Sequence, residues 1–215
     1  HHESAHSPQL HNGRLTMHNE HPSAMRKHMT HQDTNAKEQW LICGLDVLEA
    51  QGHAAVKVEP MAAQLNVTKG SFYWHFENRQ TFLDELCGYW LEKQKAIVQE
   101  FQEWRTLTPQ EELRNLLQFI LNKDTKHDLS MRLWAQDFAA ALSAVKEVDN
   151  LRLNFCTRLF KRMGFNSLQA KVRARMVVYY QIGDYTRPHN DSKQERSRYL
   201  DELFNLLTAS FENPV

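Results

Sequence analysis

With 215 residues, 41% of them hydrophobic, the chain is long enough for one or two domains with a substantial core. Its formal net charge of zero argues against a non-specific nucleic-acid binder that depends on bulk positive charge, although a few cations could still contact phosphates. No apolar run approaches transmembrane length and no signal peptide with a hydrophobic centre is seen, so a membrane or secreted protein is disfavoured.

Residues 1–33 carry eight of the twelve histidines and almost no large apolar side chains. Such a composition cannot bury enough apolar surface to fold by itself, so we expect a disordered or weakly ordered extension. A metal site is the alternative for a His-rich tract. The irregular spacing, with no cysteine or carboxylate pair to frame it, argues against that alternative, and we expect neither a metal nor a cofactor.

Two helices are predicted after the extension. The first covers Thr34–Gln51, and Gly52 ends it. The second covers Val58–Leu65, where apolar residues recur at the i, i+3, i+4 and i+7 positions. Pro60 is tolerated in the first turn of this helix, but it pushes Glu59 away from the helical region, so we expect the second helix to begin late.

The stretch Val67–Phe76 reads Val-Thr-Lys-Gly-Ser-Phe-Tyr-Trp-His-Phe and predicts a short helix. Thr68 is a suitable N-cap, and Asn66 tolerates the left-handed conformation that a tight turn between helices requires. Phe72 and Phe76 are four residues apart, so they share the face that packs on a core. The other side chains of the helix are left for an outside partner, which is typical of a helix-turn-helix.

Segment 37–86 resembles the N-terminal DNA-binding domain of the TetR/AcrR transcriptional regulators. The matching residues are Trp40-Leu41, Val47-Leu48, Gly52, Val58, Met61-Ala62, Val67–Phe76, Asn78-Arg79 and Phe82-Leu83. The chain departs from the usual family pattern where Gly44 replaces a small Ala, Lys57 replaces a Ser/Thr cap and Asn66 replaces a Gly. The resemblance implies a sequence-specific DNA-binding regulator, most simply a repressor that an unknown small-molecule effector releases from its operator.

The resemblance, together with the predicted free face of the short helix, assigns the residues that contact operator DNA. They are Lys37, Lys57, Thr68, Lys69, Gly70, Ser71, Tyr73, Trp74, His75 and Arg79. Lys69 is treated as a mobile cation at the start of the helix, and Lys69 and Ser71 are expected to lie nearest the bases.

From Asn78 onward the apolar periodicity is helical, with no strand pattern. Asn78 opens a long helix that reaches Phe101 and could act as a lever between a reading domain and a second domain. Further helices are predicted over Thr108–Leu121, Asp128–Phe138, Ala139–Met163, Asn166–Ile182 and Ser192–Phe211. We predict an all-α fold with a three-helix helix-turn-helix domain at 34–80 and a larger helical ligand-binding and dimerisation domain at 81–215.

Two sets of residues in the second domain carry functional expectations. Aromatic side chains with polar neighbours predict a ligand pocket lined by Phe119, Trp134, Phe138, Phe155, Tyr179 and Asp184. The last two helices are apolar on more than one side, so a second copy of the chain is expected to cover them. The predicted interface residues are Val178, Tyr199, Leu203 and Leu206. A two-fold axis would place two recognition helices about 34 Å apart on a pseudo-palindromic operator.

Enzyme motifs such as HExxH, GxSxG or a P-loop are absent, so we expect no catalytic activity. His127 beside Asp128 is interpreted as a surface turn, because no nucleophile pattern accompanies it. Two alternatives stay open: a regulator of the same fold controlled by a protein partner without a small ligand, and a small all-α enzyme. Three widely spaced cysteines without a CxxC pair indicate reduced thiols, so we expect the bacterial cytoplasm, with the protein on the nucleoid when bound to DNA.

Overall fold

The computed structural model describes residues 22–187 and 190–210, with side chains described from residue 35 onward. The chain divides into two compact units, His1–Lys37 and Glu38–Val215. The described part of the first unit is the beginning of helix α1 (Pro22–Gln51), which starts before the predicted Thr34. Proline is favoured in the first turn of a helix, and no further proline or glycine interrupts the sequence before Gly44. The rest of the predicted extension, residues 1–21, lies outside the described residues.

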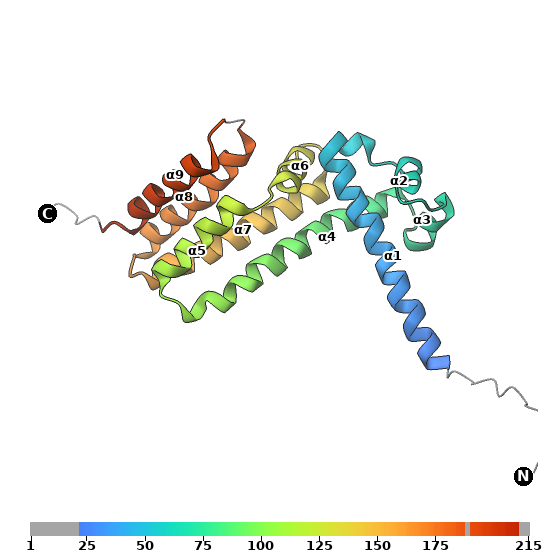
Figure 1. Ribbon diagram of the computed structural model, residues 1–215, viewed down its shortest axis with the longest axis horizontal. Helices are drawn as coiled ribbons and strands as arrows, with labels where there is room; N and C mark the ends of the chain where they lie inside the picture. Colours follow the sequence, from blue (N-terminus) through green and yellow to red (C-terminus); the bar gives the residue numbers. More distant parts are fainter. Residues whose placement is uncertain (1–21, 188–189, 211–215) are drawn as a thin grey trace, which may run out of the picture. The chain divides into compact units, whose positions relative to one another are not determined.

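The second unit contains the end of α1 and eight further helices in its described residues (Figure 1). They are α2 (Val58–Gln64), α3 (Lys69–His75), α4 (Arg79–Glu100), α5 (Pro109–Asn122), α6 (Lys126–Trp134), α7 (Ala139–Arg162), α8 (Ser167–Thr186) and α9 (Lys193–Thr208), with short 3₁₀ turns at His53–Ala55 and Phe101–Thr106. No strand occurs in the described ranges, so the all-α prediction is confirmed. No helix within those ranges has the length and apolarity that crossing a membrane requires.

Local sequence signals set most of the helix ends. Asn78 caps α4 by accepting a hydrogen bond from Thr81 N at 2.9 Å, as predicted. Reciprocal capping boxes begin α5, α8 and α9 at Thr108, Asn166 and Ser192. The late start predicted for α2 is wrong: the helix begins at Val58. Pro60 is its third residue, where a missing N–H has no intrahelical partner, so the proline disturbs nothing.

We call α1 from Glu38 onward, α2, α3 and the first two turns of α4 the head, and the remainder of the second unit the body. The core of the head is built around Phe72, which is fully buried. Its ring centroid lies 5.2 Å from that of Trp40, 5.1 Å from Phe76 and 5.3 Å from Phe82. These edge-to-face and tilted contacts are favourable for aromatic rings, and they fix α3 on α1 and α4.

Gly44 lets α1 and α4 approach closely. A Cβ at this position would lie 2.8 Å from Phe82 Cζ and 3.2 Å from Leu86 Cδ1. Both neighbours are fully buried and cannot move into solvent. Packing therefore explains why residue 44 is Gly and not the Ala that is usual in the TetR/AcrR pattern. The Phe82 ring occupies the space that an alanine methyl group would need.

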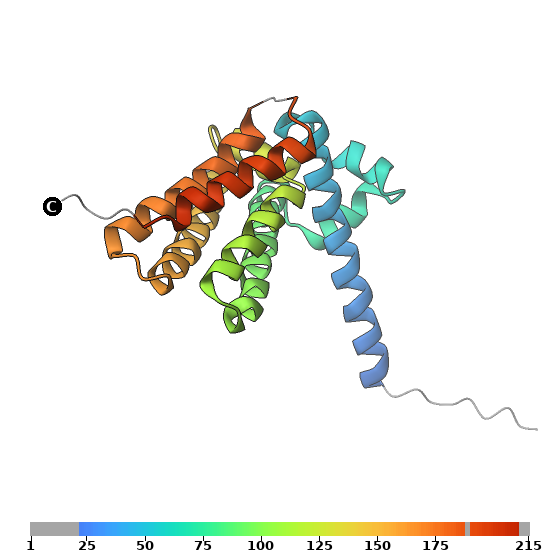
Figure 2. The same ribbon diagram turned by 60° about the vertical axis from the view of Figure 1, so that its left-hand side comes forward.

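In the body, α7 packs along α4 and α8, while α9 lies against α5 (Figures 1 and 2). One apolar cluster runs from the head into α6 and the first half of α7, where it includes Met131, Trp134 and Val148. A second cluster joins α5, α8, α9 and the later part of α7. Because the first cluster crosses residue 80 without a break, the division of 34–80 from 81–215 stays a prediction.

Candidate nucleic-acid interface

The turn between α2 and α3 has the geometry predicted for a helix-turn-helix. Asn66 has a φ of 54°, in the left-handed region. Val67 N donates a hydrogen bond to Ala62 O at 3.0 Å, and Asn66 N donates to Ala63 O at 3.1 Å. These bonds satisfy the end of α2 and turn the chain directly into α3, which asparagine can do at lower steric cost than most residues.

Helix α3 has one buried and one exposed face. Phe72 and Phe76 are buried, whereas Tyr73 is 51% and Trp74 76% exposed. The other residues predicted to contact DNA on this segment are exposed or half-buried: Thr68, Lys69, Gly70, Ser71 and His75. Thr68 occupies the N-cap position, but the predicted side-chain capping bond is absent, and the Thr68 carbonyl accepts from Ser71 N at 3.0 Å instead. The Tyr73 ring keeps an edge-to-face contact with Phe72, with centroids 5.3 Å apart, but most of the Trp74 ring is left in solvent. Two neighbouring large rings with this much exposed apolar area are suited to contact another molecule.

Lys69 is not the mobile cation that we predicted. Its ammonium group forms an ion pair with Glu59 of α2. The hydrogen bond raises the pKa of Lys69 and lowers that of Glu59, because each group stabilises the charged form of the other. The pair is exposed to solvent, so it is weak, and a phosphate could replace the carboxylate.

The other predicted cations of the interface lie in different settings. Arg79 begins α4, and its Nε donates a hydrogen bond to Val56 O at 3.0 Å, which ties the start of α4 to the segment before α2. Lys57 is exposed at the N-cap of α2. Lys37 is the last residue of the first unit, on α1.

The six residues predicted to line a ligand pocket fall into three places. Phe119 and Phe155 line one internal cavity. Trp134 stacks on Phe138 with ring centroids 4.5 Å apart, within the first apolar cluster. Tyr179 and Asp184 border a shallow surface hollow, where Asp184 is paired with Arg196. The six residues do not line one pocket, so that prediction was wrong. The sequence pattern does not distinguish Trp134 and Phe138, which pack in the first apolar cluster, from Phe119 and Phe155, which pack in the second.

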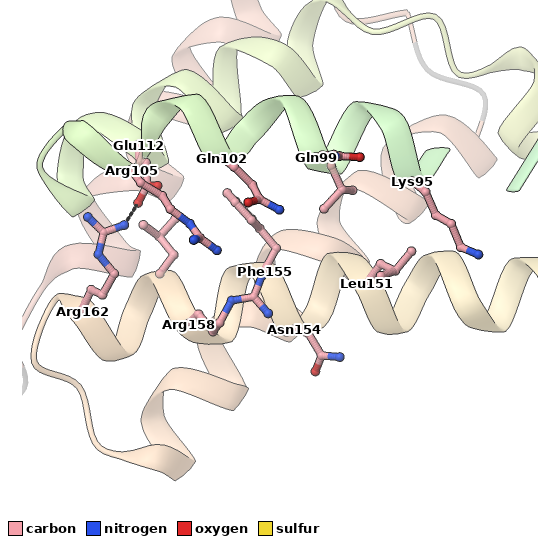
Figure 3. A pocket seen from close by; sticks show the side chains of 12 residues that line it. Lys95, Gln99, Gln102, Arg105, Glu112, Leu151, Asn154, Phe155, Arg158 and Arg162 are labelled. Atoms are coloured by element: carbon pink, nitrogen blue, oxygen red, sulfur yellow. Dashed lines mark hydrogen bonds and ion pairs between the residues drawn. The ribbon is translucent and has the colours of Figure 1, made fainter. Parts of the chain in front are cut away.

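The body instead offers an internal cavity and a groove beside it. The cavity, about 30 Å³ in volume, lies among α4, α5, α7 and α8. The groove, about 590 Å³, runs between α4 and α7 and is open to solvent. Side chains from both helices and from the 3₁₀ turn Phe101–Thr106 line the groove, among them Lys95, Arg105, Arg158 and Arg162, as Figure 3 shows. Arg162 is paired with the buried Glu112, whereas Arg105 and Arg158 have no ion pair among the described residues.

The segment that contains the turn and α3 is similar to a known protein family. Residues 44–86 match the family model described as bacterial regulatory proteins, tetR family. This segment belongs to the TetR family. The tetracycline repressor protein class G of Vibrio anguillarum is 28% identical over 67 residues, 30% of this chain and 32% of that protein. The match to this TetR relative thus spans about a third of its length.

Solved structures show that the fold is shared beyond that segment. A TetR transcriptional regulator from Legionella pneumophila has a TM-score of 0.63 with 13% identity, and the match covers 80% of this chain and 94% of the other. A TetR-family transcriptional regulator from Mesorhizobium loti has a TM-score of 0.62 with 16% identity over 81% and 96% of the two chains. The fold that the chain shares with these structures therefore extends beyond residues 44–86 into the helical body.

The residues predicted for a TetR-type dimer interface divide between core and surface. Val178 and Leu203 are only 1% and 9% exposed and pack inside the second cluster, so they cannot meet a partner. Tyr199 and Leu206 are exposed on α9. The named interface residues did not include a stripe of exposed apolar side chains on α8, although this helix was expected to carry a second apolar face. The stripe is formed by Leu168, Val172, Met176 and Tyr179. Periodicity identifies apolar faces, but it does not tell which face meets the chain's own core.

A further contact that the sequence did not reveal lies where α6 meets α1. His127 Nε2 is 3.2 Å from Glu49 Oε2 and 3.5 Å from Asp46 Oδ1. Lys126 Nζ is 3.4 Å from Glu49 Oε1. The interpretation of His127 as a surface turn is therefore wrong, because it lies in α6 against the head. No group of three or more potential metal-ligating side chains was found in the part of the chain that the structure describes.

Proposed function

We propose that the chain is a homodimeric transcriptional regulator that binds a pseudo-palindromic operator through α3 and is released by a small molecule bound in the body. The exposed face of α3 is the observation that carries DNA binding. Tyr73 and Trp74 project into solvent beside Lys69, while Phe72 holds the opposite face on the core. The match of residues 44–86 to the TetR family supports this assignment.

The head has few positive charges, so its affinity for DNA would depend on shape and hydrogen-bond complementarity as well as on charge. Residues 38–80 contain three Lys or Arg residues and five Asp or Glu residues. Lys57, Lys69 and Arg79 would contact phosphates, and the aromatic and hydroxyl side chains of α3 would reach base edges in the major groove. With at most three such cations per head, a dimer should show a salt slope no steeper than about −5.

The first experiment tests these contacts on an operator selected from a random DNA library. Lys69→Ala should weaken binding and reduce the salt slope of the dimer by about two units, because one phosphate contact is lost in each protomer. Tyr73→Ala should weaken binding and leave the slope unchanged. Lys146→Ala, which removes an exposed cation from α7, is the matched control and should change neither quantity. Normal operator binding by both folded α3 variants would show that α3 is not the recognition helix.

The exposed apolar stripe on α8 supports the homodimer. Leu168, Val172, Met176 and Tyr179 follow one another at helical spacing, and Tyr199 and Leu206 lie exposed on α9. A second copy related by a two-fold axis would cover both helices and form a four-helix bundle. Such a dimer would double the DNA contacts, which matters for a head with few cations.

The dimer is tested by placing a charge in this stripe. Met176→Lys should lower the mass measured by sedimentation and reduce operator affinity together, since a buried charge opposes association. Leu133→Lys is the control, because Leu133 is also an exposed apolar residue, 58% against 42% for Met176, but lies on α6. A parent protein that is monomeric at micromolar concentration, or a Met176→Lys protein that stays dimeric, would contradict the proposal.

Release by a small molecule rests on the length of α4. The helix begins in the head, and near its other end Gln94, Ile97 and Val98 line the internal cavity. A ligand that widened the cavity would displace this end of α4, and a rigid helix would transmit the movement to α3. Release of operator by a purified small molecule would separate this proposal from the rival in which a protein partner controls the chain. A reporter gene placed behind the operator would test repression in the bacterial cytoplasm.

A further inference from the structure

A buried ionic cluster closes one end of the internal cavity. Lys123 Nζ donates to Asp128 Oδ2, and to Gln94 Oε1 at 3.1 Å. Arg152 Nη2 donates to the same two oxygens, at 3.1 Å to Asp128 and 2.8 Å to Gln94. The side chains of Lys123, Arg152 and Asp128 are 9%, 10% and 1% exposed. Three charged groups from α6, α7 and the end of α5 are thus nearly removed from water.

The charges of this cluster do not balance. Two cations share the single carboxylate of Asp128, and the nearby Arg132 is already neutralised by two hydrogen bonds to Asp149. Arg152 Nη1 is buried without a hydrogen-bond partner among the described residues, as is Asp128 Oδ1. Burial and the Arg152 charge lower the pKa of Lys123, although Asp128 acts in the opposite direction. An unneutralised buried cation is unfavourable, so the site is suited to an additional anion.

Apart from the cluster and Gln181, the lining of the cavity is mainly apolar. Ile97, Phe101, Leu116, Phe119, Phe155 and Val177 line it, while Lys123 and Arg152 border its polar end. Its volume of about 30 Å³ corresponds to no more than about two water molecules. A larger molecule must therefore move a side chain. Val98 and Phe155 line both the cavity and the open groove of Figure 3, so a shift of the Phe155 ring would join the two spaces.

We propose that the cavity binds an apolar monocarboxylate that enters from the groove and places its carboxylate on Arg152 Nη1 and Lys123 Nζ. The hydrocarbon chain then lies along the apolar lining between α4, α5 and α7. Arg105 and Arg158 at the groove attract the anion before it enters. The role of this molecule as the effector rests on the proposed function, but its binding to the cavity does not.

The direct test compares octanoate with octanol by calorimetry, because the two differ only in the charged head group. Octanoate should bind the parent protein at least about ten-fold more tightly, the effect of one charge-assisted hydrogen bond inside a protein. Arg152→Gln should remove this preference and leave octanol binding unchanged. Arg132→Gln is the matched control, since Arg132 belongs to the same region but does not line the cavity. Equal binding of octanoate and octanol, or no octanoate binding by the folded parent, would overturn the proposal.

A second variant changes the charge in the opposite direction. Asp128→Asn leaves two buried cations without a counter-ion, so this protein should be less stable than the parent and should regain more stability when octanoate is added. The thermal-unfolding midpoint with and without octanoate measures this difference. A merely structural Asp128 would give the same octanoate shift as the parent, and that outcome would also sink the idea.

Operator binding keeps this proposal separate from the proposed function. If no DNA is selected, the regulatory function fails while the octanoate measurements still decide the ligand class. If a neutral molecule releases the operator and octanoate does not bind, the regulatory function stands and the carboxylate site is wrong.

Discussion

The head and the body have cores of different chemistry. Around Phe72 the head packs aromatic rings against one another, and the polar and charged residues that are buried in the described part of the chain lie elsewhere. They belong to the body, where Gln94, Glu112, Asp128, Arg173 and Gln181 are buried and the side chains of Lys123 and Arg152 are nearly so. A dry, closely packed core holds a recognition surface in one geometry, whereas a core with buried polar groups and a cavity can accept a guest.

The largest expected difference comes from removing one phenylalanine from each core. Phe72→Ala should lower the free energy of unfolding by about 3–5 kcal/mol, because a fully buried ring leaves a new cavity. Phe119→Ala should lower it by only about 1–2 kcal/mol, since Phe119 is half-buried and already borders a cavity. Urea unfolding of both variants measures the difference. Equal losses would show that the two cores are packed alike.

Smaller changes in the free energy of unfolding are expected when one glycine in each region is replaced by alanine, and the two changes should have opposite signs. Gly44→Ala should destabilise the protein by about 1–2 kcal/mol, because the clash with Phe82 exceeds the gain in helix propensity. Gly183→Ala in α8 meets no atom within 4 Å, so it should stabilise by up to about 1 kcal/mol. Thermal unfolding of the two variants provides the measurement, and a stabilised Gly44→Ala protein would mean that Phe82 moves aside easily.

The smallest expected difference concerns the reactivity of two buried cysteines. Burial raises the pKa of both Cys87 and Cys156 to about 12, so at pH 8 each is a thiol and reacts slowly with maleimide. Cys156 also lines the body cavity. Phe155→Ala should widen access and speed labelling of Cys156, with Cys87 in the first cluster as the internal control. Peptide mass spectrometry after timed labelling would detect the difference, and parallel acceleration at both cysteines would indicate general loosening instead.

Much of the head could be predicted because its signals are local. The turn at Asn66, the paired rings of Phe72 and Phe76, and the cap at Asn78 each depend on residues within one or two turns. The ion pair of Lys69 could not be predicted, because its partner Glu59 lies ten residues earlier on a different helix. Any pairing across helices requires their relative placement, which periodicity does not contain.

The same limit explains the errors in the body. Val178 and Leu203 lie on apolar faces, as the pattern indicated, but those faces meet the chain's own core. The cavity is defined by side chains far apart in sequence, and Arg152 reaches Gln94 across 58 positions. Helices and their caps follow from neighbouring residues, whereas a site follows from how the helices are packed.

The ion pair between Lys69 and Glu59 places a carboxylate at the start of α3, where it competes for the Lys69 ammonium group. On the proposed function, a phosphate that approaches Lys69 must first displace a carboxylate, so arrival at arbitrary DNA exchanges one anion for another with little net gain. Only DNA that also makes contacts with Tyr73 and its neighbours would offset the loss of the ion pair, and such DNA would stay bound for longer. The protein would then discriminate between DNA sequences mainly through its dissociation rate, which would be slow from the operator and fast from other DNA.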